Sequence, residues 1–188
     1  MKHPFEALHP LLLRRLYWSS IIATVAIAAI LQGLLADFTG NTPGKPAAYN
    51  IIHFEFSGTL ERAQAIMSSW GPENCERAIG QIYIDYAFLL CYPQAIALGI
   101  LAVLRNTRKK RLLACGRWLA WLQWLAGLLD AEENAALIAL LKGNTAAWLA
   151  PLAWWSAAPK FAIVLAGIVF VLVFAGLAYT RDSERATA

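Results

Sequence analysis

Hydrophobic residues along this chain gather in four long runs, and polar residues gather between them. The runs cover about residues 17–38, 78–104, 112–141 and 152–179. A helix needs roughly 20 apolar residues to cross the hydrocarbon core of a bilayer, and each run reaches that length. The pattern predicts an all-α membrane protein: a four-transmembrane-helix bundle that forms a single membrane domain over residues 1–188.

The longest connection, the outer loop over residues 39–71, predicts local structure of its own. Its first part, TGNTPGKP over residues 39–46, is typical of turns. Residues 50–56 (NIIHFEF) then alternate, which would place every second apolar side chain on one side of a strand. The alternation predicts a short extended segment lying on the bundle.

The second half of this loop predicts an amphipathic helix. Thr59 is a suitable N-cap, and the apolar residues that follow it share one helical face. They are Leu60, Ala63, Ile66, Met67 and Trp70. Gly71 and Pro72 predict a break, followed by a new helix start with Pro72 in its first turn.

Composition supports a membrane location and excludes one class of partner. The chain is 59% hydrophobic and 15% charged, whereas soluble domains are about 45–50% apolar and about 25% charged. The sequence has no basic face with interleaved aromatic residues of the kind that binds nucleic acid, so no nucleic-acid partner is expected.

Basic residues mark one side of the membrane. They precede the first span, join the second and third, and follow the fourth, whereas the other two connections are poor in them. The marking residues are Lys2, Arg14, Arg15, Arg105, Arg108, Lys109, Lys110, Arg111, Arg181 and Arg185. Because cytoplasmic loops carry an excess of Lys and Arg, both termini are predicted to be cytoplasmic.

Three charged residues inside the spans fall at one predicted depth. At about 1.5 Å per residue, Asp85, Asp130 and Lys160 lie roughly 27–29 Å from the cytoplasmic ends of their helices. Two interpretations are open. Either charges begin where the lipid ends, with Lys160 reaching toward the headgroups and nearby tryptophans forming an aromatic belt, or the charges line a polar pocket at the outer mouth of the bundle.

Helical spacing favours the pocket. Residues three and four apart share a helix face, so a set on span two and a set on span three would each converge, whereas Glu132 would point elsewhere. The candidate ligand-binding residues are Gln81, Asp85, Tyr92, Asp130, Glu133, Asn134 and Lys160. Three tryptophans on span three (Trp118, Trp121 and Trp124) are interpreted as packing residues.

The strings DYAFLLCYP and AGLLDAEENAALIALL resemble patterns in uncharacterised bacterial four-span membrane proteins. This resemblance covers spans two and three with the preceding loop. It implies a multi-pass protein of the bacterial inner membrane, and it brings no activity and no functional residues.

Three functions stay open at this point. The first is binding of a small amphipathic or lipid-like molecule in the polar pocket. The second is a membrane enzyme that performs acid–base chemistry on a lipid-soluble substrate, although the sequence has no GxSxG, Walker, HExxH or GxGxxG motif. The third is an accessory subunit of a larger membrane complex. Membrane lipid is an expected partner, and a homodimer or a membrane-protein partner stays open. The residues identify no catalytic group, no cofactor and no metal site.

Overall fold

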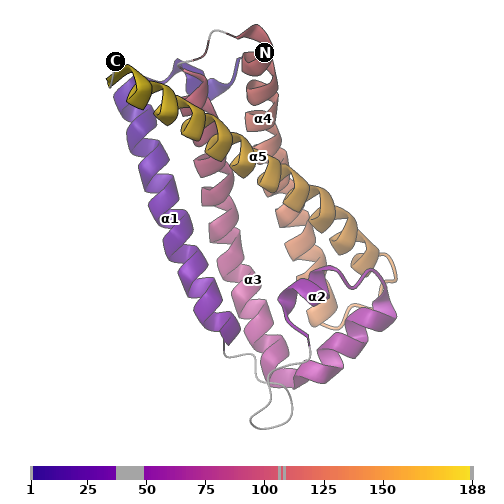
Figure 1. The fold of residues 1–188 in the computed structure, drawn as a ribbon. Helices are drawn as coiled ribbons and strands as arrows, with labels where there is room; N and C mark the ends of the chain where they lie inside the picture. Colours follow the sequence, from indigo (N-terminus) through magenta and orange to yellow (C-terminus); the bar gives the residue numbers. More distant parts are fainter. Residues whose placement is uncertain (1, 37–48, 106, 108, 187–188) are drawn as a thin grey trace.

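The computed structural model describes residues 2–36, 49–105, 107 and 109–186 of the 188-residue chain, with side chains described to residue 34 in the first long helix and to 176 in the last. Four long helices form the bundle (Figure 1): α1 (Pro10–Ala36), α3 (Leu60–Leu104), α4 (Lys110–Leu141) and α5 (Leu149–Ala186). Two short elements, η1 (Pro4–Ala7) and α2 (Ile51–Glu55), complete the order. The described residues contain no strand, so the predicted all-α fold class is confirmed.

All four long helices are long and apolar enough to cross a membrane, and the chain is a multi-pass membrane protein. α3 lies at the centre and contacts α1, α4 and α5, whereas α1 packs mainly against α3. The N-terminal segment and the C-terminal end of α5 lie at one end of the bundle, and α2 lies at the other (Figure 1). We call these the terminal end and the α2 end.

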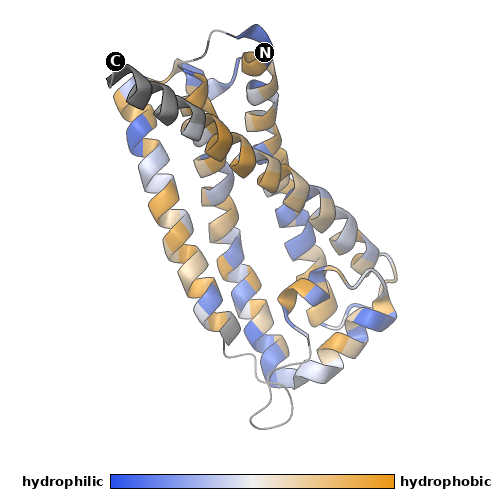
Figure 2. Ribbon diagram, in the orientation of Figure 1, coloured by the Kyte–Doolittle hydropathy of each residue, from blue (hydrophilic) through white to orange (hydrophobic). Residues whose placement is uncertain are grey.

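Figure 2 shows hydrophilic residues recurring toward the α2 end of α3 and α4, within helices that are otherwise hydrophobic. The prediction that both termini lie on one side fits an even number of crossings. Which side is cytoplasmic stays a prediction. Arg108 and the side chains of Arg181 and Arg185 lie outside the described part of the chain.

The extended segment predicted over residues 50–56 is wrong, because these residues form the short helix α2. Asn50 caps it: its Oδ1 accepts from the His53 N–H at 3.1 Å, and the His53 ring accepts from the Asn50 N–H at 3.3 Å. This reciprocal capping satisfies backbone donors locally and removes the need for a strand partner. The alternation was misleading, since Ile52 is 52% exposed while Ile51 and Phe54 are buried in the core. The predicted turns at residues 39–46 lie outside the described residues.

The amphipathic helix predicted after Thr59 is confirmed as the first part of α3. The Thr59 hydroxyl accepts from the Arg62 N–H at 3.2 Å. The predicted apolar face packs against α2, α4 and the start of α5, with Trp70 against Phe54 at 5.2 Å between ring centroids. This part of α3 lies across the α2 end of the bundle in Figure 1 and covers it.

The predicted break at Gly71 is also confirmed. Gly71 has φ 77° and ψ 172°, a conformation that side chains with a Cβ adopt only with strain. The chain turns here from the covering helix into the long spanning part of α3, which begins at Pro72.

Two glycines let the helices approach closely around the middle of the bundle. A Cβ at Gly127 of α4 would lie 3.1 Å from Pro93 of α3. A Cβ at Gly167 of α5 would lie only 2.5 Å from the side chain of Gln123, which is fully buried and donates to the Ile163 carbonyl at 3.1 Å. These contacts fix α4 against both of its neighbours.

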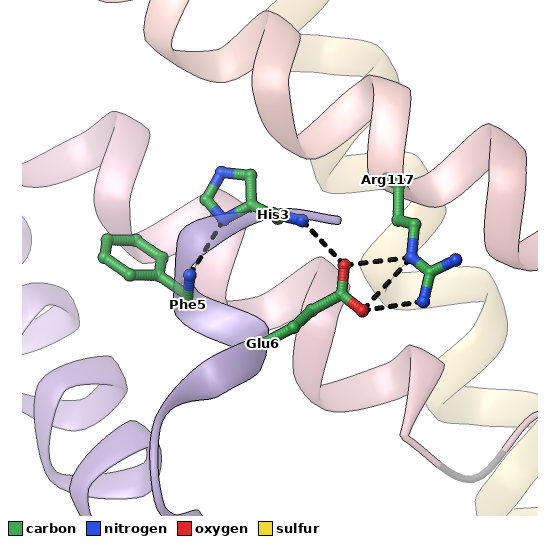
Figure 3. A network of polar contacts seen from close by, with 4 residues as sticks. All are labelled: His3, Phe5, Glu6 and Arg117. Carbon is green, nitrogen blue, oxygen red and sulfur yellow. Dashed lines mark hydrogen bonds and ion pairs between the residues drawn. The ribbon is translucent and has the colours of Figure 1, made fainter. Parts of the chain in front are cut away.

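The N-terminal segment docks against α4 through a compact polar network (Figure 3). Arg117 donates to both carboxylate oxygens of Glu6, from Nε at 2.9 and 3.1 Å and from a terminal nitrogen at 2.7 Å. The His3 N–H donates to the same carboxylate at 2.8 Å. The His3 ring is buried between Trp121 and Trp124, which confirms packing roles for two of the three predicted tryptophans. We call this group the N-terminal latch.

Candidate functional site

One face of α4 supplies the first polar residues of the site. Asp130, Glu133, Asn134 and Leu137 are all at most 4% exposed, as their spacing of three and four residues predicted. Glu132 points away and is exposed, also as predicted, with its carboxylate accepting from the Ser156 hydroxyl at 3.1 Å. The inward face of α4 therefore carries two carboxyl groups and an amide into the bundle.

Lys160 of α5 meets both of these carboxyl groups. Its Nζ lies 2.9 Å from Asp130 Oδ1 and 2.6 Å from Glu133 Oε2. The Lys160 residue is 6% exposed, so it does not reach out to the headgroups. An ammonium inserted between two carboxylates in a low-dielectric interior stabilises both of them, and it is itself paired twice.

Asp85 of α3 joins the group from the opposite side. The Asn134 amide nitrogen donates to Asp85 Oδ2 at 2.7 Å, which links α4 to α3 at the level of the ion pairs. No described cation forms an ion pair with Asp85. Its nearest favourable contact is the dipole of one amide, while Lys160 acts on it only from a greater distance.

The fourth carboxyl group, Glu55, comes from α2. Burial raises the pKa of Glu55 to about 7, while Lys160 opposes the rise and Asp130 and Asp85 add to it. Glu55 Oε2 is buried and makes no hydrogen bond of good geometry among the described residues, although the Glu133 carboxyl group lies nearby. We call Glu55, Asp85, Asp130, Glu133 and Lys160 together the carboxylate cluster.

A cavity of about 320 Å³ opens beside this cluster, between α1, α3 and α5. Its polar wall is formed by Thr24, Glu55, Asp85, Tyr92, Asp130 and Lys160. Its apolar wall is formed by Phe88, Ala95, Ile96, Phe161, Val164 and Ile168. We call it the membrane cavity. Its volume falls within the range of about 300–1,000 Å³ that is usual for small-molecule sites.

Several polar atoms on the cavity wall lack an internal partner. The Tyr92 hydroxyl makes no hydrogen bond of good geometry within the described residues, although the Asp130 carboxylate lies nearby. The Thr24 hydroxyl and Glu55 Oε2 are likewise buried and without a partner there. Buried polar groups without a partner are costly, so these three groups are the ones on the cavity wall that can still form hydrogen bonds.

The structure thus gathers six of the seven candidate residues around one place and leaves one aside. Asp85, Tyr92, Asp130 and Lys160 line the membrane cavity, and Glu133 and Asn134 support it from behind. Gln81 is 7% exposed but does not line the cavity. Whether these residues bind a ligand stays a prediction.

The structure agrees in part with both interpretations of the charged residues that were predicted at one depth. Asp130 and Lys160 are buried and paired with each other, as the pocket interpretation predicts. Tyr83, Trp148 and Trp155 are 53%, 62% and 69% exposed, which is typical of an aromatic belt.

The candidate ligand-binding residues did not include Glu55. An available signal was the Asn50 cap: if residues 51–55 are helical, then Ile51, Phe54 and Glu55 share a face by their spacing of three and four. Thr24 and Phe161 carried no such signal, because a single hydroxyl or ring in an apolar span is common.

Among the described residues, no group of His, Cys, Asp and Glu has an arrangement that could hold a metal ion. The cluster is instead suited to holding or exchanging protons, to binding a positively charged group, and to orienting a molecule that has both polar and apolar parts.

Comparison with known proteins adds no assignment to this geometry. No protein-family model, curated protein or solved structure matches the chain.

Proposed function

We propose that this protein binds a small amphipathic or lipid-like molecule in the membrane cavity. The observation that carries the proposal is the combination of one charged wall and one apolar wall around a single cavity between spanning helices. Ligand sites usually combine apolar walls with a few convergent polar groups. The polar part of the molecule would contact the carboxylate cluster, and its apolar part would lie between α1 and α5.

The cost of the cluster supports a functional role. Charged groups within spanning segments are expensive, and they usually mark a substrate path, a proton relay or a ligand counter-ion. Here one lysine and three carboxyl groups lie in the spanning helices, and a fourth carboxyl group is brought to them by α2. A bundle of this size can pack without them, since replacing buried ion pairs by apolar residues is often neutral or stabilising.

The experiment that tests the proposal is native mass spectrometry of the protein purified in a mild detergent. We expect a retained molecule of low mass whose extraction identifies an amphiphile. Ala95→Phe places a ring in the cavity and should abolish retention. Ala87→Phe is the matched control, because Ala87 is an exposed residue of the same helix.

Loss of the molecule in Ala95→Phe but not in Ala87→Phe supports the proposal. Equal retention in both variants contradicts it, because the molecule would then be bound elsewhere. Absence of any retained molecule, together with a stable co-purifying protein, would favour the accessory-subunit alternative instead.

A second candidate function is acid–base chemistry on a lipid-soluble substrate. One observation favours it: the pKa of Glu55 is raised to about 7 by burial, so this carboxyl group can both give and take a proton near neutral pH. Conversion of the retained amphiphile by the wild-type protein, and its loss in Glu55→Gln, would establish catalysis. Binding of the amphiphile without its conversion would contradict catalysis and support the binding function.

For location, we propose the bacterial inner membrane with both termini cytoplasmic. Basic residues at the N-terminal end of α1, between α3 and α4 and at the C-terminal end of α5 support this orientation. In that orientation the α2 end faces the outside, and Cys75 in α3 should react with a membrane-impermeant thiol reagent added to intact cells. Reaction only after the cells are opened would contradict it.

A further inference from the structure

The charges of the carboxylate cluster do not balance. Four carboxyl groups converge, and within the described residues a single ammonium group pairs with them. Lys160 is already engaged by Asp130 and Glu133 at 2.9 and 2.6 Å. Asp85 and Glu55, which both line the membrane cavity, therefore form no ion pair within the part of the chain that the structure describes.

The walls beside these two carboxyl groups are aromatic. Phe88 and Tyr92 pack together at 5.1 Å between ring centroids, and both line the cavity. Phe161 lines it from α5, and its ring already accepts the Lys160 ammonium at 4.7 Å from the centroid. Aromatic faces beside uncompensated carboxylates are the surroundings that attract ammonium groups, including quaternary ones.

A hydroxyl group gives an independent sign of an occupant at the same place. Tyr92 is 5% exposed and lines the cavity, yet its hydroxyl completes no hydrogen bond among the described residues. It is therefore available to a polar group of the occupant.

A second cavity extends the apolar wall away from the cluster. It has a volume of about 140 Å³ and shares Ala95, Ile96 and Ile168 with the membrane cavity. It continues between α1 and α5 as far as Gly99 of α3, where a Cβ would meet Tyr17 at 3.2 Å and Val171 at 3.3 Å. Because the neighbouring helices close over α3 at this point, the apolar path ends there.

The length of this path sets the length of the occupant. Asp85 and Gly99 are fourteen residues apart on α3, which corresponds to roughly 21 Å at the helical rise. The path is narrow, because the second cavity has a volume of only about 140 Å³. It fits one extended alkyl chain better than a fused ring system or a pair of chains.

We infer that the occupant is a single-chain amphiphile with an ammonium headgroup, the headgroup lying between Asp85, Glu55 and the aromatic wall and the chain running toward Gly99. This inference rests on the proposed function and specifies its ligand. A proton is the alternative neutraliser of the excess carboxylates, and the experiment below distinguishes the two.

The experiment measures binding of three probes with the same chain to the protein in nanodiscs. The probes are hexadecyltrimethylammonium, hexadecylphosphocholine and hexadecyl sulfate, with octyltrimethylammonium as the short-chain comparison. We expect the hexadecyl ammonium probe to bind at least about tenfold more tightly than the sulfate and the octyl probes, which is about 1.4 kcal/mol.

Three variants identify the site. Asp85→Asn should lower the preference for ammonium over sulfate by about tenfold, and Tyr92→Phe should weaken ammonium binding by less while leaving the fold intact. Glu132→Gln is the matched control, because it also removes one carboxylate of the bundle but from an exposed position. It should leave the preference unchanged.

The outcomes separate this inference from the proposed function. Suppose that all three headgroups bind equally and that Ala95→Phe blocks their binding. This result would overturn the ammonium headgroup but keep the amphiphile site. An Asp85→Asn variant with an unchanged preference for ammonium would have the same meaning. Equal binding of octyl and hexadecyl chains would overturn the chain path. No binding of any probe, or binding that Ala95→Phe does not affect, would overturn both the inference and the proposed function.

Discussion

Both ends of the bundle pair carboxyl groups with basic groups, but the ratio of carboxyl groups to basic groups differs between them. At the terminal end, one carboxylate of the N-terminal latch meets one guanidinium, and Glu6 receives three bonds from Arg117 and one from the His3 backbone. Among the described residues at the α2 end, four carboxyl groups meet one ammonium. The first arrangement is balanced and complete, which is typical of a structural contact. The second has an excess of carboxyl groups and borders a cavity, which is the basis of the proposed ligand site.

Burial separates the two ends further. The side chains of Arg117 and Glu6 are 29% and 23% exposed, whereas those of Lys160, Asp130 and Glu133 are 8%, 6% and 0% exposed. Water screens the latch, and little water reaches the cluster. Equal changes of charge should therefore have unequal effects at the two ends.

Lys160→Met should have the largest effect. It removes the ammonium partner of Asp130 and Glu133 and leaves both carboxyl groups buried, which should cost about 3–5 kcal/mol in the apparent free energy of unfolding. The measurement is reversible unfolding in detergent micelles. Lys142→Met is the matched control: Lys142 is an exposed lysine that donates to the Tyr83 hydroxyl at 3.0 Å, and its loss should change stability by no more than about 0.5 kcal/mol.

Two further substitutions test the cause of the loss of stability in Lys160→Met. Adding Asp130→Asn and Glu133→Gln to Lys160→Met removes the orphaned charges and should restore part of the lost stability. If Lys160→Met costs no more than Lys142→Met, the cluster is not held by its lysine, and the contrast between the two ends fails.

The two ends should respond to pH in opposite directions. The pKa of Glu55 is raised from 4.5 to about 7, so the folded state holds this proton more tightly than the unfolded chain does. Stability at the α2 end should therefore fall as the pH rises from about 4.5 to about 7, by on the order of 3 kcal/mol. Glu55→Gln should remove this dependence.

The N-terminal latch has the reverse sign. Burial alone would raise the pKa of Glu6, but hydrogen bonds from Arg117 and from the His3 N–H hold it below 4.5, and burial holds the pKa of His3 below 6.5. The latch should be firm at neutral pH and loosen on acidification. Hydrogen exchange of η1 and α2, corrected for the intrinsic rate, measures both trends. The same sign at both ends would contradict the comparison.

Gly71→Ala should loosen the α2 end alone. A Cβ at φ 77° costs about 1–2 kcal/mol. Relief of this strain would move the first part of α3, residues 60–70, away from the carboxylate cluster. Gly80→Ala is the matched control, because Gly80 is helical and an added Cβ meets nothing within 4 Å. It should stabilise the protein by about 0.5–1 kcal/mol. Hydrogen exchange in α2 should rise in the first variant only, and a rise in η1 as well would show that the ends are not independent.

Glu6→Gln should have the smallest effect. A partly exposed pair contributes little, so the loss should be about 1 kcal/mol and confined to exchange of η1. Glu73→Gln is the control, since Glu73 pairs with Arg77 at 2.8 Å on an exposed helix surface and its loss should be near zero. A loss in Glu6→Gln that equals that of Lys160→Met would contradict the distinction between a screened and a buried pair.

Apolar runs and helical periodicity in the sequence predicted most of the fold. The four spans and the helix after Thr59 follow from the spacing of apolar residues, and the break at Gly71 follows from the conformation that glycine allows. All of these signals lie within short stretches of sequence. The α4 face with Asp130 and Glu133 was predictable for the same reason. Seven residues of alternating sequence at 50–56 were too few to distinguish a strand from a capped helix. The helix α2 was therefore not predicted, and Glu55 was not among the candidate site residues.

The remaining contacts depend on how distant segments meet. Nothing near Glu6 in the sequence indicates that Arg117 lies beside it, since 111 residues separate them. Likewise, the partners of Lys160 could be identified only once the crossing of α4 and α5 was known. Local patterns predict which face of a helix is polar, and tertiary packing determines which polar faces share a cavity.

The pairing of Lys160 also bears on how the chain enters the bilayer during synthesis. α4 and α5 are joined by residues 142–148 alone, and both carboxylate partners of Lys160 lie on α4. Inserted alone, α5 would carry the Lys160 ammonium into the bilayer without a partner, at a cost of up to about 2.5–3.5 kcal/mol. If α4 and α5 enter as one helical hairpin, the ammonium can pair with Asp130 and Glu133 from the start. The ion pairs beside the cavity of the finished protein would then also favour insertion of the last two spans together.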